Sequence, residues 1–301
     1  MSETSMLRPG VAFPFALVSL IWGSTWWVIT GQIDAAPASW SVAFRFALAT
    51  PAMFVVAAAM KRSLRLGRDG QVLALLVGIA QFCGNYNFVY RAEEHLTSGI
   101  VAVMIALLLV PNALLARALL GQPITRRFMA GSAIAIAGIG LLLLHEARAA
   151  PLGGQVWLGV GYALIAMLCA SISNVVQANE TGRRLPMVSL LAWAMFYGTV
   201  IDAAIAWVSE GPPVLPTAPA YWLGTGYLAL FGSVVTFPLY YTLIRTLGAG
   251  RASYNGVAVV VIAMLLSTLL EGYRWSLLSG AGAALATLGL IVALSARKPA
   301  V

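Results

Sequence analysis

Charge is scarce in this sequence. Only 9% of the 301 residues are charged, whereas 60% are hydrophobic and the mean hydropathy is +0.88. Soluble domains carry about 25% charged residues, so this composition excludes an ordinary soluble domain. An unpaired polar group is costly in hydrocarbon, and a helix bonds its backbone groups along its own length. The sequence therefore predicts an all-α integral membrane protein.

The residues that bind metals or drive chemistry are also few. The chain has two cysteines, Cys83 and Cys169, and two histidines, His95 and His145, each in a different segment. Because metal sites need three or four ligands at workable spacing, we expect no metal and no cofactor. No nucleophile and base converge, and no G-x-x-x-x-G-K-[ST] motif occurs. We therefore expect no enzyme and no ATP-driven pump within this chain, and nothing favours a channel or a receptor.

Long apolar runs, in contrast, are abundant. A helix rises 1.5 Å per residue, so crossing the roughly 30 Å hydrocarbon core takes about 20 apolar residues. The connections between such runs are short, so no soluble domain is expected between them. The sequence predicts ten membrane-spanning helices, at residues 13–31, 39–59, 71–90, 96–118, 127–145, 155–177, 187–208, 221–243, 252–270 and 276–296.

The basic residues fall mainly in alternate loops. Lys61, Arg62, Arg126 and Arg127 lie on the same predicted side as both ends of the chain, and few basic residues lie opposite. Loops rich in Lys and Arg stay in the cytoplasm, so we expect both termini to be cytoplasmic. The net charge of +8 is thus an orientation signal, and no nucleic-acid partner is expected.

The two halves of the chain resemble each other. The stretch "YRAEEHLTSG" at 90–99 is similar to "YTLIRTLGAG" at 241–250, and Pro37 before the second predicted helix corresponds to Pro186 before the seventh. Both pairs are separated by about half the chain. A constant separation of this kind indicates an internal duplication.

The duplication predicts a first five-helix repeat at 1–150 and a second at 151–301. Since five is odd, the second repeat enters the membrane in the opposite sense, so the two are inverted. Inverted repeats are typical of secondary transporters, in which the solute binds near mid-membrane between the repeats and a rocking motion gives alternating access.

Several stretches also carry a family resemblance. "SLIWGSTWWVI" at 19–29, "PASWSVAFRFALATP" at 37–51 and the leucine-rich turn into "GQPITRR" at 121–127 resemble the drug/metabolite transporter superfamily, specifically its ten-helix EamA-type members. Within it the chain is most similar to the YddG-type exporters of aromatic amino acids. The resemblance implies outward transport across the bacterial inner membrane, through a pocket lined mainly by helices 1, 3, 4, 6, 8 and 9. It departs from the pattern at Val260, where no proline matches Pro111 of the fourth helix.

Helices 1 and 3 supply the first candidates for solute contact. Trp22 and Trp26 lie one turn apart on one face of helix 1, where they could stack on an apolar or aromatic side chain. In helix 3, "QFCGNYNFVY" at 81–90 concentrates amides and aromatic rings, and we expect Asn85 and Tyr86 to line an aqueous cavity. The alternative for all four is packing between helices, because amides also join helices inside membranes.

Helices 6 and 8 supply further polar groups. These groups could bind the carboxylate and ammonium of a zwitterion without a full counter-charge, although serines also bond their own helix backbone. The candidates are Ser171, Asn174 and Gln177 at three-residue steps in helix 6, and Thr236 and Tyr240 in helix 8.

Three residues are candidates for a gate. Arg45 and Asp202 are charges within predicted spans, which are functional suspects by default. They lie at similar depth, so a salt bridge between them could close one side, although snorkelling of Arg45 to the interface is a simpler explanation. Tyr254, where helix 9 begins, is either a gate or an interfacial anchor.

The small-residue runs "AGIG" at 137–140 and "SGAGAALATLG" at 279–289 are expected to be scaffold for close helix packing.

Taken with the near absence of intramembrane charge, these residues favour neutral or zwitterionic solutes. We therefore expect an exporter of amino acids, aromatic or other neutral ones, and of related metabolites. The alternative is an efflux carrier for amphipathic drugs or other small metabolites, bound by the same tryptophans through stacking or cation–π contacts. Besides the solute and the lipid bilayer no partner is expected, and the carrier is either a monomer or a homodimer.

Overall fold

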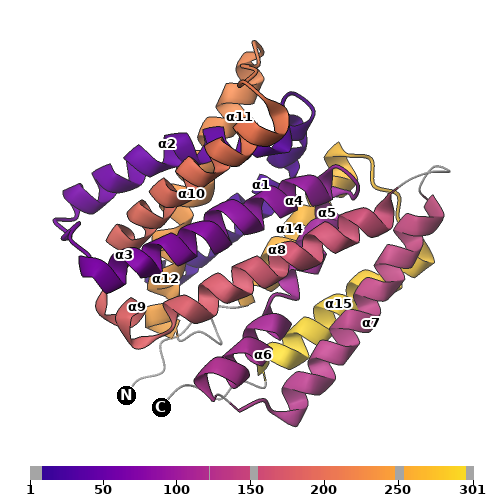
Figure 1. Ribbon diagram of the computed structural model, residues 1–301. Coiled ribbons are helices and arrows are strands. Elements are labelled where there is room, and N and C mark those ends of the chain that lie inside the picture. The colour runs from indigo at the N-terminus through magenta and orange to yellow at the C-terminus, as the bar shows by residue number, and fades with distance from the viewer. Residues whose placement is uncertain (1–8, 122, 150–154, 248–253, 296–301) are drawn as a thin grey trace. The chain divides into compact units, whose positions relative to one another are not determined.

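The computed structural model describes residues 9–121, 123–149, 155–247 and 254–295, and all regular structure within them is helical (Figure 1). The helices of the first half are α1 (Pro9–Ile33), α2 (Ala38–Ala59), α3 (Gly67–Val77), η1 (Gly78–Asn85), α4 (Tyr86–Glu93), α5 (Ser98–Ala106), α6 (Leu109–Leu120) and α7 (Arg126–Ala149). Those of the second half are α8 (Val156–Gln177), α9 (Glu180–Arg184), α10 (Met187–Glu210), α11 (Pro219–Ala229), η2 (Leu230–Val235), α12 (Thr236–Leu247), α14 (Tyr254–Leu270) and α15 (Leu277–Ser295).

These helices account for the predicted membrane spans. Within the described residues, nine continuous or jointed helices are long and apolar enough to cross a membrane, and α14 is a tenth, shorter apolar helix. The fourth span is jointed at Leu107 and Leu108, where α5 ends and α6 begins. Pro111 causes this break, because it lacks an N–H and its ring clashes with the carbonyl four residues earlier. Helix α14 has no such proline and runs unbroken.

Two spans contain a π-helical insertion that the sequence analysis did not predict. The third span passes from α3 through η1 to α4, and the eighth passes from α11 through η2 to α12. These spans occupy the same place in their halves of the chain. A π-turn widens the helix and shifts the face on which later side chains lie, and such turns are frequent at functional sites.

By internal contacts the chain separates into two compact units. The first comprises the described residues of Met1–Trp27, His95–Val160 and Thr236–Val301, and the second comprises Val28–Glu94 and Gly161–Val235. Each unit therefore contains helices from both halves of the chain. These packing units cut across the sequence repeats, so the division at residue 150 stays a prediction about sequence alone.

In the first unit, α7 and α15 lie side by side (Figure 1). Glycine makes this approach possible: a Cβ added at Gly138 would lie 2.3 Å from the backbone nitrogen of Ala286, and one at Gly289 would lie 2.2 Å from that of Ala135. Real Cβ atoms essentially never come so close. The prediction that the small-residue runs permit close packing is confirmed.

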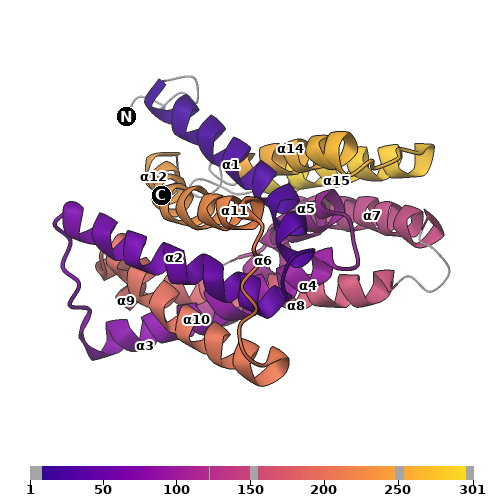
Figure 2. The same cartoon turned by 90° about the horizontal axis from the view of Figure 1, so that it is seen from above.

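In the second unit, α10 packs along α2 and against η1 and α3 (Figure 2). Thr50 of α2 and Thr199 of α10 share a hydrogen bond of 3.1 Å between their hydroxyls. A Cβ at Gly78 would lie 2.7 Å from the carbonyl oxygen of Ala194, so here too glycine brings backbones together. The contact fixes the start of the π-helical segment against α10.

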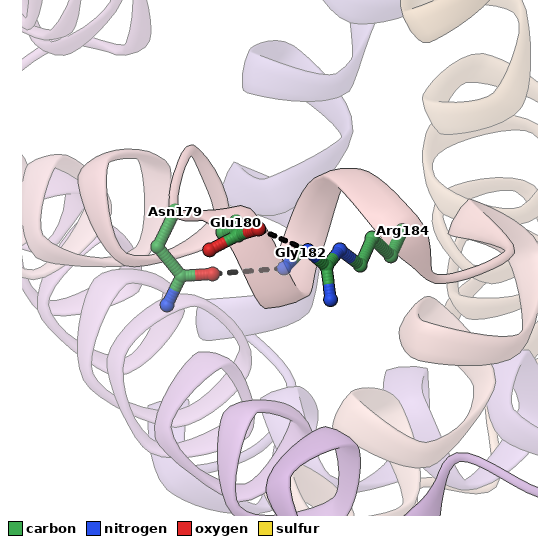
Figure 3. A network of polar contacts seen from close by, with 4 residues as sticks. All are labelled: Asn179, Glu180, Gly182 and Arg184. Atoms are coloured by element: carbon green, nitrogen blue, oxygen red, sulfur yellow. Dashed lines mark hydrogen bonds and ion pairs between the residues drawn. The ribbon is translucent and has the colours of Figure 1, made fainter.

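The short helix α9 follows α8 and is capped by Asn179. The side-chain oxygen of Asn179 accepts a 2.8 Å hydrogen bond from the backbone nitrogen of Gly182, which satisfies one unpaired donor of the first turn (Figure 3). Glu180 and Arg184, one turn apart, form an exposed ion pair. Side chains of this segment therefore stabilise the turn between α8 and α10.

Candidate functional site

The predicted site residues are divided between the two compact units. The first unit holds Trp22 and Trp26 of α1, Thr236 and Tyr240 of α12, and Tyr254 of α14. The second unit holds Arg45, Asn85, Tyr86, Ser171, Asn174, Gln177 and Asp202. Each group is described within its own unit.

An aromatic cluster surrounds Trp22 in the first unit. Its ring centroid lies 5.0 Å from that of Tyr240 and 5.7 Å from that of Phe237, both on α12. The structure thus brings together two of the predicted residues and adds Phe237, which the sequence did not single out. One turn along α1, the indole N–H of Trp26 is buried and has no hydrogen-bond acceptor. Tryptophan N–H groups normally find a partner when buried, and this donor departs from that rule.

Near the start of α14, Asn255 rather than Tyr254 makes the specific contacts. Asn255 is fully buried and its amide nitrogen donates to the carbonyl of Phe15 at 3.1 Å and to the hydroxyl of Ser19 at 2.7 Å. Both partners belong to α1. Tyr254 is half-buried beside it. The amide therefore joins α14 to α1 close to the aromatic helix face.

In the second unit the polar atoms of Asn85 are already bonded within the protein. Its amide nitrogen donates to the carbonyl of Ala166 on α8 at 3.0 Å, and its side-chain oxygen accepts from Gln81 at 3.1 Å. The residue is 6% exposed. Packing between helices, the alternative that the sequence left open, is thus what its amide does in this conformation. The π-helical turn of η1 also means that the regular α-helical faces assumed for this segment do not hold.

Arg45 is buried in the same unit, 2% exposed. Its guanidinium donates to the hydroxyl of Ser233 at 3.2 and 3.4 Å and to that of Tyr90 at 3.5 Å, and its centre lies 4.4 Å from the ring centroid of Tyr86. Neither of the two alternatives considered for Arg45 describes this conformation. Among the described residues Arg45 forms no ion pair with Asp202, and it does not snorkel, because hydroxyls and an aromatic face hold its charge inside the protein.

The partners of Arg45 were missed by sequence reasoning. Tyr90 is fully buried. Ser233 lies in η2, where its hydroxyl also donates to the carbonyl of Leu228 at 3.1 Å. Arg45 therefore connects α4, which follows η1, with η2. The signal that could have found Ser233 is its place in helix 8, the repeat counterpart of helix 3.

Asp202 is the second charge inside a span and is fully buried. One carboxylate oxygen accepts a 2.7 Å hydrogen bond from the amide nitrogen of Asn87, and the other has no partner. Asn87, on α4, thus contacts α10.

The polar stripe of α8 divides into separate environments. Gln177 donates to the hydroxyl and carbonyl of Ser173, at 3.0 and 3.3 Å, which are local contacts one turn back. Ser171 is fully buried and its hydroxyl has no partner, whereas Asn174 is half-buried. The hydroxyl of Ser171 and the side-chain oxygen of Gln177 are thus buried polar atoms without a hydrogen-bond partner.

Comparison with known proteins identifies the fold and the family. The sequence model of the EamA-like transporter family matches residues 11–144 and again residues 157–295. Each match covers five of the apolar helices. Since five is odd, the two repeats cross the membrane in opposite senses, and the chain is a protein of ten transmembrane helices arranged as two inverted repeats.

Individual relatives agree with this match. The inner membrane transporter YedA of Escherichia coli strain K12, described as uncharacterized, is 30% identical over 86% of this chain and 81% of its own length. Protein PagO of Salmonella typhimurium strain LT2 is 24% identical over 90% of this chain and 88% of its own. A solved crystal structure that shares 21% identity superposes with a TM-score of 0.68, over 95% of this chain and 98% of that one, and shows the same fold.

Proposed function

Because this chain belongs to the EamA-like transporter family, we propose that it exports amino acids, aromatic or other neutral ones, and related metabolites by alternating access. Membership makes it a multi-pass membrane transporter rather than an enzyme. The names of its relatives specify no solute, so the substrate class rests on the residues of this chain. The specific subtype we propose is the YddG-type exporter.

One observation supports this substrate class above the others. The indole N–H of Trp26 is a buried donor without an acceptor, one turn from the cluster of Trp22, Tyr240 and Phe237. A carboxylate or carbonyl of the solute could accept from this donor while an apolar or aromatic side chain packs against the rings. Both are features of a neutral amino acid.

The charges within the spans agree with a zwitterion or neutral solute. Away from the helix ends, the described spans contain only Arg45 and Asp202 as charged side chains. Arg45 is committed to Ser233 and Tyr90, and so is less suited to a phosphate. A solute with strong net charge would therefore find little compensation.

The remaining features of the carrier are part of the same proposal. The solute contacts are Trp22, Trp26, Asn85, Tyr86, Ser171, Asn174, Gln177, Thr236 and Tyr240. Asn85 contributes to them only in a conformation that frees its amide from Ala166, and Arg45, Asp202 and Tyr254 contribute to gating. The repeats at 1–150 and 151–301 rock against each other in a bacterial inner membrane, with both termini cytoplasmic, and the carrier acts as a monomer or homodimer.

The test is transport by the purified protein in liposomes. Labelled phenylalanine should enter protein-containing vesicles faster than protein-free ones, and unlabelled neutral amino acids should compete. If no amino acid is carried or competes while aromatic cations are carried, the proposed substrate class is wrong and the chain is an efflux carrier for amphipathic drugs.

A further inference from the structure

A carboxylate lies unpaired in the second compact unit. Asp202 is in the body of α10 and none of its surface is exposed. Its Oδ1 accepts a 2.7 Å hydrogen bond from Nδ2 of Asn87, but Oδ2 is buried without any partner. Buried charges are ordinarily paired or coordinate metals, and an unpaired one favours its neutral form. Within a membrane span, solvent can do little to compensate such a charge.

The elements packed against α10 provide no cation for this carboxylate. Elements α2, η1 and α3 surround it. On α2, Arg45 bonds to Ser233 and Tyr90 instead. On η1, the neutral thiol of Cys83 lies beside the carboxylate and supplies no positive charge. The other titratable groups with charge on α3 and α10 lie at or near the helix ends and are exposed: Arg68, Asp69 and Glu210.

The neighbouring amide of Asn87 also has a polar atom without a hydrogen-bond partner. Both hydrogens of the Asn87 amide nitrogen are used, one by Asp202 and one by the carbonyl of Cys83 at 3.0 Å. These two bonds fix which end of the amide is nitrogen. Its oxygen, Oδ1, is a second buried acceptor without a donor. With Asp202 ionised, the pair therefore contains two buried acceptors, Oδ2 of Asp202 and Oδ1 of Asn87, that receive no hydrogen bond.

One added proton would give both of these oxygens a hydrogen bond. A proton on Oδ2 of Asp202 turns that oxygen into a donor, and the free carbonyl oxygen of Asn87 belongs to the amide that already binds the other carboxyl oxygen. A carboxylic acid and a primary amide can bond in this reciprocal manner, each donating once and accepting once.

We propose that Asp202, paired with Asn87, is a proton-binding site that couples transport to the proton gradient. The proton is bound in the conformation seen here and is released when the helices around α10 rearrange. This inference rests on the proposed export function, which sets the direction: a proton moves inward as the solute moves outward. Arg45 holds its charge separately and is not the partner of this carboxylate.

The coupling test uses liposomes whose lumen is more acidic than the outside by one pH unit, with valinomycin and equal potassium on both sides to hold the membrane potential near zero. If one proton leaves per solute that enters, labelled phenylalanine should accumulate up to about tenfold, because one unit of pH corresponds to a tenfold ratio. The variant Asp202→Asn should take up phenylalanine only to equal concentrations, at a rate independent of pH. Asp34→Asn, which removes an exposed carboxylate, should accumulate like wild type.

A second measurement needs no solute. The wild-type protein in lipid at neutral pH should show the infrared carbonyl band of a protonated carboxyl group, shifted by deuterium exchange and absent from Asp202→Asn. If the band is absent from wild type, or if Asp202→Asn still accumulates solute, the proton site is refuted. If the band is present but no amino acid is transported, the site stands and the proposed substrate class fails.

Discussion

The crossing of α7 and α15 gives a sharp test of how this protein is held together. A Cβ at Gly138 would lie 2.3 Å from the nitrogen of Ala286 and 2.6 Å from the carbonyl oxygen of Gly282, both backbone atoms that cannot rotate away. Ordinary contact begins at 3.4 Å, so Gly138→Ala must separate the two helices by about 1 Å. Overpacking of this kind costs about 1–3 kcal/mol.

The matched control is two residues away. Nothing lies within 4 Å of a Cβ built at Gly140, which is on the same helix. Both variants gain about 0.5–1 kcal/mol from replacing a helical glycine with alanine, so this term cancels between them. Gly138→Ala should therefore be less stable than Gly140→Ala by about 1–3 kcal/mol. The partner helix offers the same comparison, because a Cβ at Gly282 would lie 2.8 Å from the carbonyl oxygen of Gly138, whereas Gly280 is open.

The assay is loss of the monodisperse peak on size-exclusion chromatography after heating in detergent, which reports an apparent melting temperature. Gly138→Ala and Gly282→Ala should lose the peak several degrees below wild type, while Gly140→Ala and Gly280→Ala should match or exceed it. Equal stability of Gly138→Ala and Gly140→Ala would show that the helices do not cross at these glycines, and the packing argument would be refuted.

Two further predictions concern the polar and aromatic groups. Trp26→Phe keeps a ring but removes the unpaired N–H. If a charge-assisted hydrogen bond of about 1.5–3 kcal/mol is lost, the KM for phenylalanine should rise by about tenfold or more. The control Trp27→Phe, at a 40% exposed position, should leave the KM unchanged. Ser233→Ala removes an acceptor of the buried Arg45 guanidinium and should destabilise the protein by about 1.5–3 kcal/mol, measured by the same thermal assay, whereas Ser209→Ala on the exposed end of α10 should have no measurable effect.

Local sequence was sufficient for the membrane-spanning helices of this fold. Apolar runs of spanning length predicted the ten helices. Pro111 marks the joint between α5 and α6, because it lacks an N–H and its ring clashes with the carbonyl four residues earlier, whereas Pro14 and Pro51 lie inside unbroken helices. The glycines of 137–140 and 279–289 predicted a close crossing, since small residues have this effect in most membrane helices.

The partners within the fold were not predictable in the same way. Arg45 and Asp202 were identified as unusual charges, but not that the first would bond to Ser233 and Tyr90 and the second to Asn87. Those pairings depend on the π-helical segments η1 and η2, which shift the positions of all side chains that follow them. Periodicity arguments assume a regular helix and cannot reveal such a shift.

By itself the sequence determined that the protein lies in a lipid bilayer, how many times it crosses the bilayer and that its two halves are duplicated. Hydrophobicity, length and internal similarity are properties of the sequence alone. Only the tertiary structure decided which buried polar groups satisfy one another. The stability of a charge within a membrane span depends on atoms far away in sequence. The positions of those atoms leave Oδ2 of Asp202 without a hydrogen-bond partner, whereas the guanidinium of Arg45 has hydroxyl partners.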